Sequence, residues 1–374
     1  MKFNVSSKAL YSCVSAVSKV INSKNAMTIL NSFYFTLAEN RITVTASDME
    51  NTLTGSLEVS GVEGEGSFCV DAHRLVDLLK ELPDVGITFE VNPENFAISI
   101  KYPGSKFDFV GVNGNEYPNT QESAEAIYKF SVPVNVILQG IDSTLFAVGS
   151  DPVRPQMMGI LWDIKPEVIT FVSTDTRKLV KYSNTSAKTG IEGSFILPVK
   201  PASILKNIIS KSENVDIQME PKSVTFNDGN YSLNCRFIKG NFPDYNKVIP
   251  QNNPFTLTVD RVNFLNAVRR VGVFVDPAHG LVKFKIKPDK LTLKAQDNNF
   301  CTNAVESLPC DFTGKEMVIG FSSAFLIEII NTLSTEEIQL RLSDPARPGV
   351  FVPSENKENS ELLILLMPMS VQEF

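Results

Sequence analysis

The stretch Phe3-Asn4-Val5-Ser6-Ser7-Lys8-Ala9-Leu10 sets the pattern from which the fold is predicted, because it returns twice. The second copy is Phe130-Ser131-Val132-Pro133 followed by Val134-Asn135-Val136-Ile137-Leu138, and the third is Leu257-Thr258-Val259-Asp260 followed by Arg261-Val262-Asn263-Phe264-Leu265. Val5, Val132 and Val259 lie 127 residues apart, twice over. Solenoid repeats have periods of only ~20–50 residues, so the chain is predicted to use one domain-sized module three times.

Two further landmarks recur in the same order. A short strand running into a helix is predicted at residues 68–80, 196–206 and 318–330. Pro118, Pro243 and Pro368 follow at a spacing of 125 residues. Polar or structure-breaking residues at 119–125 and 250–254 mark the boundaries. We therefore predict three domains, at 1–125, 126–251 and 252–374.

Each module is predicted to be α+β, an antiparallel sheet with two helices packed on one face. Apolar residues at helical spacing predict helices at 7–20, 71–82, 133–146, 199–212, 261–273 and 321–333. Asp71 and Asp260 occupy N-cap positions, and Ser322 or Ser323 would cap the last helix. Alternating or apolar runs predict strands at 41–46, 168–173 and 290–295, and residues 227–230 predict a hairpin turn.

Composition excludes several classes of protein. No apolar run approaches the ~18–20 residues needed to cross a bilayer, and the N-terminus lacks the apolar core of a secretion signal. The five cysteines are odd in number and show no CxxC spacing, which favours free thiols in a reducing cytoplasm. The chain has only two histidines, so neither a His-rich metal site nor any cofactor is predicted.

The distribution of charge is more informative than the net charge of −7. Three predicted helices carry +2, +3 and +3 and the other three carry −1 each, giving +5 for the helices and −12 for the rest of the chain. Lys and Arg are good helix formers, so part of this bias is expected of any helix. A basic surface lined by helices would attract phosphates without reading bases, while the acidic remainder would repel nucleic acid.

Two other classes of function remain as alternatives. An enzyme is disfavoured because neither His73 nor His279 lies in a recognisable catalytic motif, and the phosphate-binding and zinc-protease motifs are absent. A multidomain β-rich adhesion or structural protein without a DNA role would be expected to have a secretion signal and paired cysteines. We expect no catalytic residues.

The triplicated module with its two helices, the motif Asn241-Phe242-Pro243-Asp244-Tyr245 and the ending Leu365-Leu366-Met367-Pro368-Met369 resemble the bacterial DNA polymerase III β sliding-clamp family over the whole chain. The resemblance implies that two chains close head to tail into a ring of six similar domains. It implies that twelve helices line a hole encircling duplex DNA without sequence preference. The ring would tether the replicative polymerase and also serve the clamp loader, other polymerases and repair proteins.

The resemblance also implies a hydrophobic pocket for short partner peptides between the second and third domains. The residues that match it are Met157, Thr174, Thr176, Arg177, Leu179, Pro243, Lys247, Val248, Ala346, Pro348, Leu365, Leu366, Met367, Pro368 and Met369. Met-rich walls suit a site that must accept many peptides, because Met repacks easily. Leu362 to Met369 could equally form a buried strand, and both interpretations hold if alternate side chains face opposite ways.

The chain departs from the family pattern in two places. The family commonly has Gly where Thr176 stands and His or a similar residue where Arg177 stands. The tail Ser370-Val371-Gln372-Glu373-Phe374 is longer than usual and lacks a basic residue beside the pocket. The peptide preference is therefore left open.

Candidates for the other two surfaces follow from the same resemblance. The subunit interface would join the first domain of one chain to the third domain of the other, through Arg74, Phe107 and Phe109 on one side and Val273 and Phe274 on the other. Candidates for facing DNA are Lys8, Lys24, Arg154, Lys200, Lys206 and Arg269.

Overall fold

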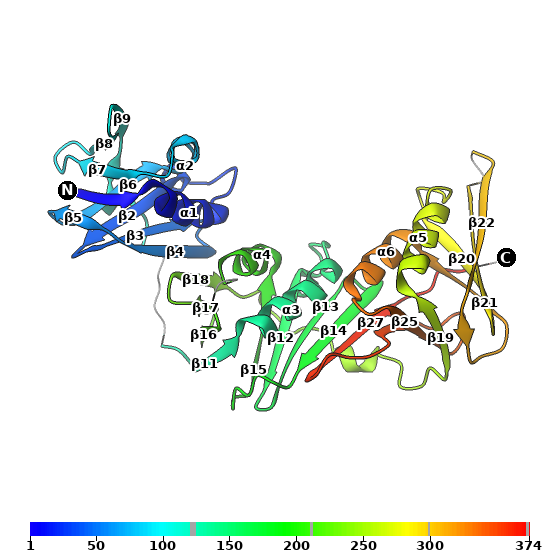
Figure 1. The fold of residues 1–374 in the computed structure, drawn as a ribbon. Helices are drawn as coiled ribbons and strands as arrows, with labels where there is room; N and C mark the ends of the chain where they lie inside the picture. The colour runs from blue at the N-terminus through cyan, green and yellow to red at the C-terminus, as the bar shows by residue number, and fades with distance from the viewer. Residues whose placement is uncertain (120–124, 210–211, 298–299, 372–373) are drawn as a thin grey trace. The chain divides into compact units, whose positions relative to one another are not determined.

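The computed structural model describes residues 1–119, 125–209, 212–297, 300–371 and 374 (Figure 1). Within them lie the helices α1 (Ser7–Val17), α2 (Ala72–Glu81), α3 (Val134–Thr144), α4 (Val199–Ile208), α5 (Arg261–Gly272) and α6 (Ser323–Thr332). Each confirms a predicted helix. The polar linker predicted at 120–124, the end of the fourth predicted helix at 210–211 with Lys211, and tail residues 372–373 lie outside the described residues.

The helix starts behave as the sequence predicts. Asp71 accepts a hydrogen bond from the N–H of Arg74 at 2.9 Å, and Asp260 accepts one from the N–H of Asn263 at 2.7 Å. These bonds satisfy backbone donors that the first turn of a helix leaves unpaired. Ser322 occupies the N-cap position of α6, although its side chain makes no capping bond.

The strand pairings of the described residues are antiparallel and form four sheets. One nine-stranded sheet has the order β10 (Val112–Asn113), β6 (Gly66–Asp71), β2 (Ser32–Ala38), β3 (Arg41–Ser47), β4 (Asn51–Glu58), β18 (Tyr231–Arg236), β17 (Ser223–Asn227), β16 (Asn214–Met219), β11 (Tyr128–Pro133). The other has the order β15 (Gly193–Pro198), β12 (Gly159–Lys165), β13 (Val168–Thr174), β14 (Lys178–Asn184), β27 (Ser360–Leu366), β26 (Gly349–Pro353), β25 (Glu337–Leu342), β19 (Phe255–Asp260), β23 (Asp311–Phe312).

The two smaller sheets come from the two ends of the chain. The five-stranded sheet has the order β5 (Ser60–Glu63), β1 (Lys2–Ser6), β7 (Gly86–Val91), β8 (Ala97–Tyr102), β9 (Ser105–Val110). The four-stranded sheet has the order β22 (Thr302–Pro309), β21 (Lys290–Asp297), β20 (Leu281–Lys287), β24 (Met317–Ser322). The predicted strands are confirmed as β3, β13 and β21, and the predicted hairpin turn joins β17 to β18.

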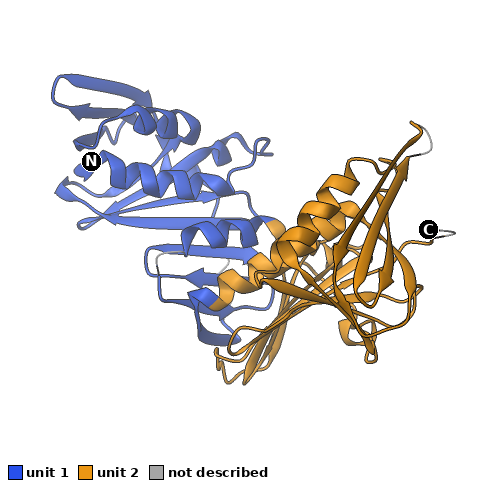
Figure 2. Ribbon diagram, turned by 45° about the vertical axis from the view of Figure 1, so that its right-hand side comes forward, with its two compact units in different colours: residues 1–135, 200–237 blue, residues 136–199, 238–374 orange. Residues whose placement is uncertain are grey.

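The chain folds into two compact units (Figure 2). Unit 1 comprises residues 1–135 and 200–237, and unit 2 comprises 136–199 and 238–374. Each nine-stranded sheet lies within one unit and joins strands of two neighbouring predicted modules, so the middle module is shared between the units. The predicted domain boundaries at 125/126 and 251/252 stay a prediction.

The threefold repeat is visible in the order of the elements. Val5, Val132 and Val259 are buried on β1, β11 and β19, and each of these strands runs directly into a helix. The second strand-to-helix start of each copy is β6–α2, β15–α4 and β24–α6. No helix in the described part of the chain is both long and apolar enough to cross a membrane.

Each unit has its own apolar core. In unit 1 the rings of Phe3 and Phe89 stack with centroids 5.1 Å apart, and those of Phe35 and Phe68 stack at 5.0 Å. In unit 2 one core cluster joins α5 and α6 to strands of both of its sheets. Stacked aromatic pairs of this kind contribute about 0.5–1.5 kcal/mol beyond their buried area.

Candidate functional site

An apolar cluster lies on the face of the large sheet of unit 2 that points away from α5 and α6. Leu179 on β14 is paired with Leu365 on β27. Their side chains pack into what we call the β14–β27 cluster, which consists of Leu161, Val172, Leu179, Ile196, Tyr245 and Leu365. The sheet pairing thus brings together two predicted pocket residues that are far apart in the sequence.

The pleat of β27 corrects one predicted pocket residue. Successive side chains of a strand point to opposite faces. Leu366 is 1% exposed and packs in the core with the helices, as do Val180 and Ile364. Leu366 therefore supports the sheet from behind, and we remove it from the pocket wall.

The segment that follows β18 covers part of the cluster. The N–H of Ile238 donates to the carbonyl of Ile196 at 3.1 Å, and Phe242 and Ile249 pack against the cluster. The hydroxyl of Tyr245 donates to Asp163 Oδ2 at 2.8 Å. Burial raises the pKa of Tyr245, and the hydrogen bond to Asp163 raises it further. The phenol therefore stays protonated and acts as a donor.

The turn between β13 and β14 forms one side of the site. The hydroxyl of the buried Thr174 donates to the carbonyl of Lys178 at 2.8 Å and accepts the N–H of Thr176 at 3.1 Å. Thr176 has a φ of 77°, a left-handed conformation that favours glycine. The carbonyl of the exposed Arg177 accepts the N–H of Met367 at 2.8 Å, which ties this turn to the end of β27.

Met157 lies beside the same turn, in the short 3-10 helix Pro155–Met157. Its carbonyl accepts the N–H of Gly149 at 2.8 Å. A Cβ on Gly149 would lie 3.2 Å from that carbonyl oxygen and 3.3 Å from the carbonyl oxygen of Thr174. Glycine at this position therefore permits the close approach of Met157 to Thr174.

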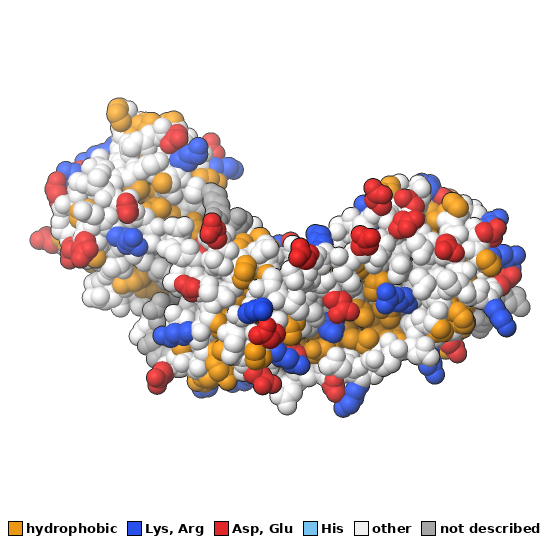
Figure 3. Space-filling model, turned by 60° about the horizontal axis from the view of Figure 1, so that its bottom comes forward, with side chains coloured by type: hydrophobic (Ala, Val, Ile, Leu, Met, Phe, Trp, Pro, Cys, Tyr) orange, Lys and Arg blue, Asp and Glu red, His pale blue; other side chains and the backbone are white. Residues whose placement is uncertain are grey.

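The rim of the site carries exposed apolar side chains. Val248 is 54% exposed and Met367 is 42% exposed, and Pro243 is also exposed. Figure 3 shows hydrophobic side chains gathered at the surface among acidic and basic ones. Exposed apolar patches rimmed by polar groups are typical of binding sites.

The remaining predicted pocket residues lie in three separate segments. Lys247 pairs with Asp244 at 3.0 Å. Pro368 and Met369 are half-buried, and Met369 forms an isolated bridge with Gly320. Ala346 and Pro348 lie in the loop between β25 and β26, outside the cluster; Ala346 is exposed and Pro348 half-buried.

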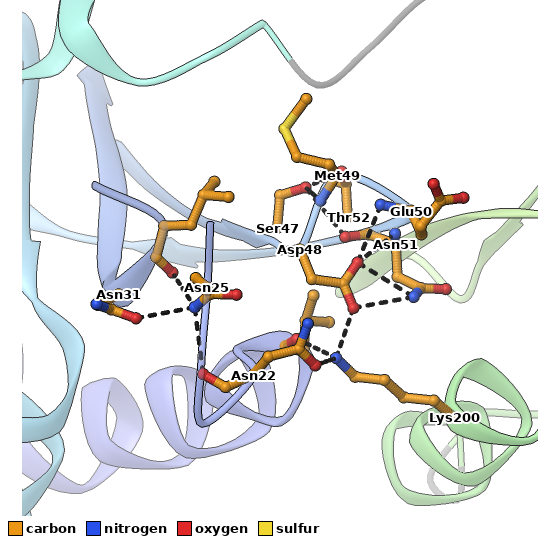
Figure 4. A network of polar contacts seen from close by, with 12 residues as sticks. Asn22, Asn25, Asn31, Ser47, Asp48, Met49, Glu50, Asn51, Thr52 and Lys200 are labelled. Carbon is orange, nitrogen blue, oxygen red and sulfur yellow. Dashed lines mark hydrogen bonds and ion pairs between the residues drawn. The ribbon is translucent and has the colours of Figure 1, made fainter. Parts of the chain in front are cut away.

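The six DNA-facing candidates differ in their surroundings. Lys8, Lys24, Arg154 and Arg269 are exposed, whereas Lys206 is half-buried and has an interaction partner. Lys200 points into unit 1, where its ammonium lies 2.5 Å from Asp48 Oδ2 and 2.7 Å from Asn22 Oδ1 and also contacts the carbonyl of Val20 (Figure 4). Its charge is neutralised within the protein, so we remove Lys200 from the DNA-facing candidates.

The five candidates for the subunit interface lie at the surface of the two units. Phe107 and Phe109 are half-buried at alternate positions of β9, and Arg74 is exposed on α2. In unit 2, Val273 is 78% exposed and Phe274 is 39% exposed just after α5. Two adjacent exposed apolar side chains are unfavourable in water unless a partner covers them.

Sequence reasoning missed Tyr245 and the strand residues of the cluster. Leu161 and Val172 lie in mostly apolar runs, Gly159-Ile160-Leu161-Trp162 and Val168-Ile169-Thr170-Phe171-Val172, the second interrupted by Thr170. Such runs indicate a strand covered on both faces. That signal was present, but it does not reveal which segment supplies the second cover.

Among the described residues, no three His, Cys, Asp or Glu side chains gather closely enough to hold a metal ion. The candidate site combines apolar packing with side-chain and backbone hydrogen bonds. An arrangement of this kind can bind an extended peptide with apolar anchors.

Known protein families match nearly all of the chain. The N-terminal, central and C-terminal domains of the DNA polymerase III beta subunit match residues 1–121, 131–244 and 246–370. The beta sliding clamp of Caulobacter vibrioides strain NA1000 is 26% identical, and the match covers 99% of this chain and 100% of that protein. The beta sliding clamp of Bacillus subtilis strain 168 is 24% identical, with 98% and 99% covered.

Solved structures show the same fold. The DNA polymerase sliding clamp of Pseudomonas aeruginosa with ligand has a TM-score of 0.93 at 22% identity, covering 99% of this chain and 100% of that one. The DnaN sliding clamp (DNA polymerase III subunit beta) of Bartonella birtlesii bound to griselimycin has a TM-score of 0.92 at 25% identity, with the same coverage.

Proposed function

Because the chain belongs to the DNA polymerase III beta subunit family, the family of the beta sliding clamps, we propose that two copies close head to tail into a ring. The ring encircles duplex DNA, makes the replicative polymerase processive, and recruits other proteins through the β14–β27 cluster. This function is non-catalytic and is exerted in the cytoplasm.

The arrangement of the sheets is the observation that carries the proposal. At the first module junction β4 pairs with β18, and at the second β14 pairs with β27. The first strand of each pair is the fourth strand of its module, and the second is the third strand after the second helix of the next module. By this rule β22, the fourth strand of the third module, should pair with a strand of a following module, and β9, the third strand after α2, should pair with a strand of a preceding one.

A second copy of the chain supplies both missing partners. In the described part of the chain, β22 ends the four-stranded sheet and β9 ends the five-stranded sheet. Joining them between copies produces another nine-stranded sheet, like the two within the chain. Uncovered strand edges readily pair with other strands, and a head-to-tail interface that closes on itself forms a ring.

The exposed side chains near these edges support the same interface. Phe107 and Phe109 lie on β9 itself, and Val273 and Phe274 lie in the unit that carries β22. Aromatic and aliphatic side chains commonly provide most of the binding energy of an interface.

Contact with DNA is proposed for the exposed basic residues Lys8, Lys24, Arg154 and Arg269, with Lys206 as a half-buried candidate. Lysine and arginine neutralise phosphates regardless of base sequence. Weak and interchangeable phosphate contacts suit a ring that is held on DNA by its topology, because tight specific contacts would oppose sliding.

The β14–β27 cluster and its rim are the proposed receptor for short peptide motifs of polymerases, the clamp loader and repair proteins. Support comes from the exposed apolar rim at Val248 and Met367. The griselimycin complex of the Bartonella birtlesii clamp also shows that a related clamp binds a ligand.

A run-off experiment tests the ring. The protein is loaded onto nicked circular DNA with a clamp loader, and the DNA is then linearised. A ring held by topology slides off the ends, so the bound fraction should fall after linearisation and persist on the intact circle. Retention on linear DNA, or binding that needs no loader, would rule out the sliding ring.

A further inference from the structure

A buried lysine lies directly behind the proposed peptide pocket. Lys178, on β14, is 5% exposed and precedes Leu179 of the β14–β27 cluster. Its ammonium lies 2.8 Å from Glu328 Oε2 on α6 and 3.2 Å from Asp175 Oδ2, and it lies 4.1 Å from the ring centroid of Phe325. Because neighbouring side chains of a strand face opposite ways, Lys178 does not line the pocket itself.

Asp175 connects this cation to the shape of the turn. Its Oδ1 accepts the N–H of Arg177 at 2.9 Å and the N–H of Lys178 at 2.8 Å. The turn includes Thr176 at a φ of 77°, a conformation that costs energy for a residue with a Cβ and persists only where its surroundings enforce it. The Asp175 carboxylate, held by the buried ammonium of Lys178, can keep the backbone of this turn in that conformation, because hydrogen bonds to charged groups are strong.

The turn at residues 174–179 also positions the end of β27. The carbonyl of Arg177 accepts the N–H of Met367, so the two sides of the pocket are linked by one backbone hydrogen bond. A continuous series of contacts therefore runs from Glu328 through Lys178 and Asp175 to Met367.

The same device occurs independently in unit 1. Asp48 Oδ1 accepts the N–H groups of Glu50 at 3.0 Å and Asn51 at 2.7 Å, and its Oδ2 binds Lys200 (Figure 4). Met49 in this turn has a φ of 75°. At both module junctions within the chain, an aspartate that shapes the turn is therefore bound to a lysine.

We propose that Lys178 is a positioning residue for the peptide pocket. Its ammonium holds Asp175 and Glu328, and thereby keeps the turn at 174–179 and the Met367 segment in the arrangement that receives the partner's apolar anchors. This inference rests on the proposed peptide-binding function, and Lys178 does not contact the peptide.

The test measures binding of a fluorescent peptide from the tail of the replicative polymerase by fluorescence anisotropy. Lys178→Met keeps an apolar side chain of similar length but removes the charge, whereas Lys178→Arg keeps the charge. The matched control is Lys188→Met, which removes an exposed lysine that also pairs with a carboxylate, Glu167, at 3.3 Å.

Lys178→Met should raise the peptide Kd about tenfold, within the range found for residues that act through others. Lys178→Arg should restore most of the affinity, and Lys188→Met should leave it unchanged. Circular dichroism and solution mass establish that each variant is folded. If Lys178→Met fails to fold, Glu328→Gln provides a second test, because it alters a partly exposed side chain. Glu328→Gln should raise the peptide Kd several-fold.

If folded variants at Lys178 and Glu328 bind the peptide as tightly as the wild-type chain, the positioning role of Lys178 is overturned, whereas the proposed peptide receptor is unaffected. A wild-type chain that fails to bind the peptide would overturn the proposed peptide receptor, and the inference with it. A loss of thermal stability without a change in Kd would identify Lys178 as a purely structural residue.

Discussion

Replacing Val273 and Phe274 together by serine should dissociate the proposed ring. Full burial of a valine or phenylalanine side chain stabilises by about 1.5–3 kcal/mol. Val273 is 78% exposed and Phe274 is 39% exposed in the single chain, so covering both contributes about 2–3 kcal/mol at one interface. A closed ring of two chains contains this interface twice, so the dimer should lose about 4–6 kcal/mol.

That loss corresponds to a dimer dissociation constant about 10³–10⁴-fold higher, at 1.4 kcal/mol for each factor of ten. Sedimentation velocity over a dilution series measures it, because the single chain has a mass of 41.3 kDa and the ring has twice that mass. The matched control is Val262→Ser, which changes a valine that is 50% exposed at the start of α5. It should leave the dissociation constant unchanged.

Mixing two different variants tests the head-to-tail geometry. A chain with Phe107→Ser and Phe109→Ser should also dissociate. In a mixed dimer with the Val273→Ser, Phe274→Ser chain, one interface carries every substitution and the other carries none. Facing side chains share the same contacts, so the losses at the doubly substituted interface should not add in full, and the mixture should dimerise more tightly than either variant alone. Unchanged affinity of the variants, or no gain on mixing, would refute the interface.

Three further results are expected. Met367→Ala should weaken binding of a polymerase tail peptide by several-fold, as expected for truncating an exposed anchor, whereas Met27→Ala, at 44% exposed, should not; equal affinities in anisotropy titrations would argue against the pocket. Cys301 is exposed and should react with a thiol reagent in the native protein, whereas Cys235, whose pKa is raised by burial, should react only after unfolding, as mass spectrometry can show. The hydrogen bond from Lys101 lowers the pKa of Glu90, so the Glu90 carboxylate stabilises the fold above the unfolded-state pKa near 4.5, and this contribution is lost as the pH falls through the lower folded-state pKa. Glu90→Gln should lower the urea midpoint at pH 7, and the difference should shrink as the pH falls below 4.5; a difference that stays constant would contradict this.

Local elements were predictable because their signals are local. Asp71 and Asp260 each bond a backbone N–H three residues ahead, so the sequence window contains both the cap and the helix it starts. The 127-residue spacing of Val5, Val132 and Val259 revealed the repeat for a similar reason, since each copy must build the same strand-to-helix core.

The pocket is predicted only through the family resemblance, and the structure shows which of its candidate residues share one face of the sheet. Leu179 and Leu365 meet because β14 pairs with β27 in one register, and that register turns Leu366 to the core instead. A shift of one residue in the register of β27 would turn Leu366 toward the β14–β27 cluster and Leu365 toward the core. Nothing in the local sequence forbids such a shift.

For the charged residues, too, part of the answer lies in the sequence and part only in the tertiary structure. The sequence by itself determined that the helices are the basic part of an acidic chain, because composition follows from the residues alone. Only the tertiary structure decided that Lys200 is bound to Asp48, 152 residues away, and that Lys178 is bound to Glu328, 150 residues away. An ion pair depends on a separation of a few ångströms, and that separation is set by long-range strand pairing and helix packing rather than by any short stretch of the chain.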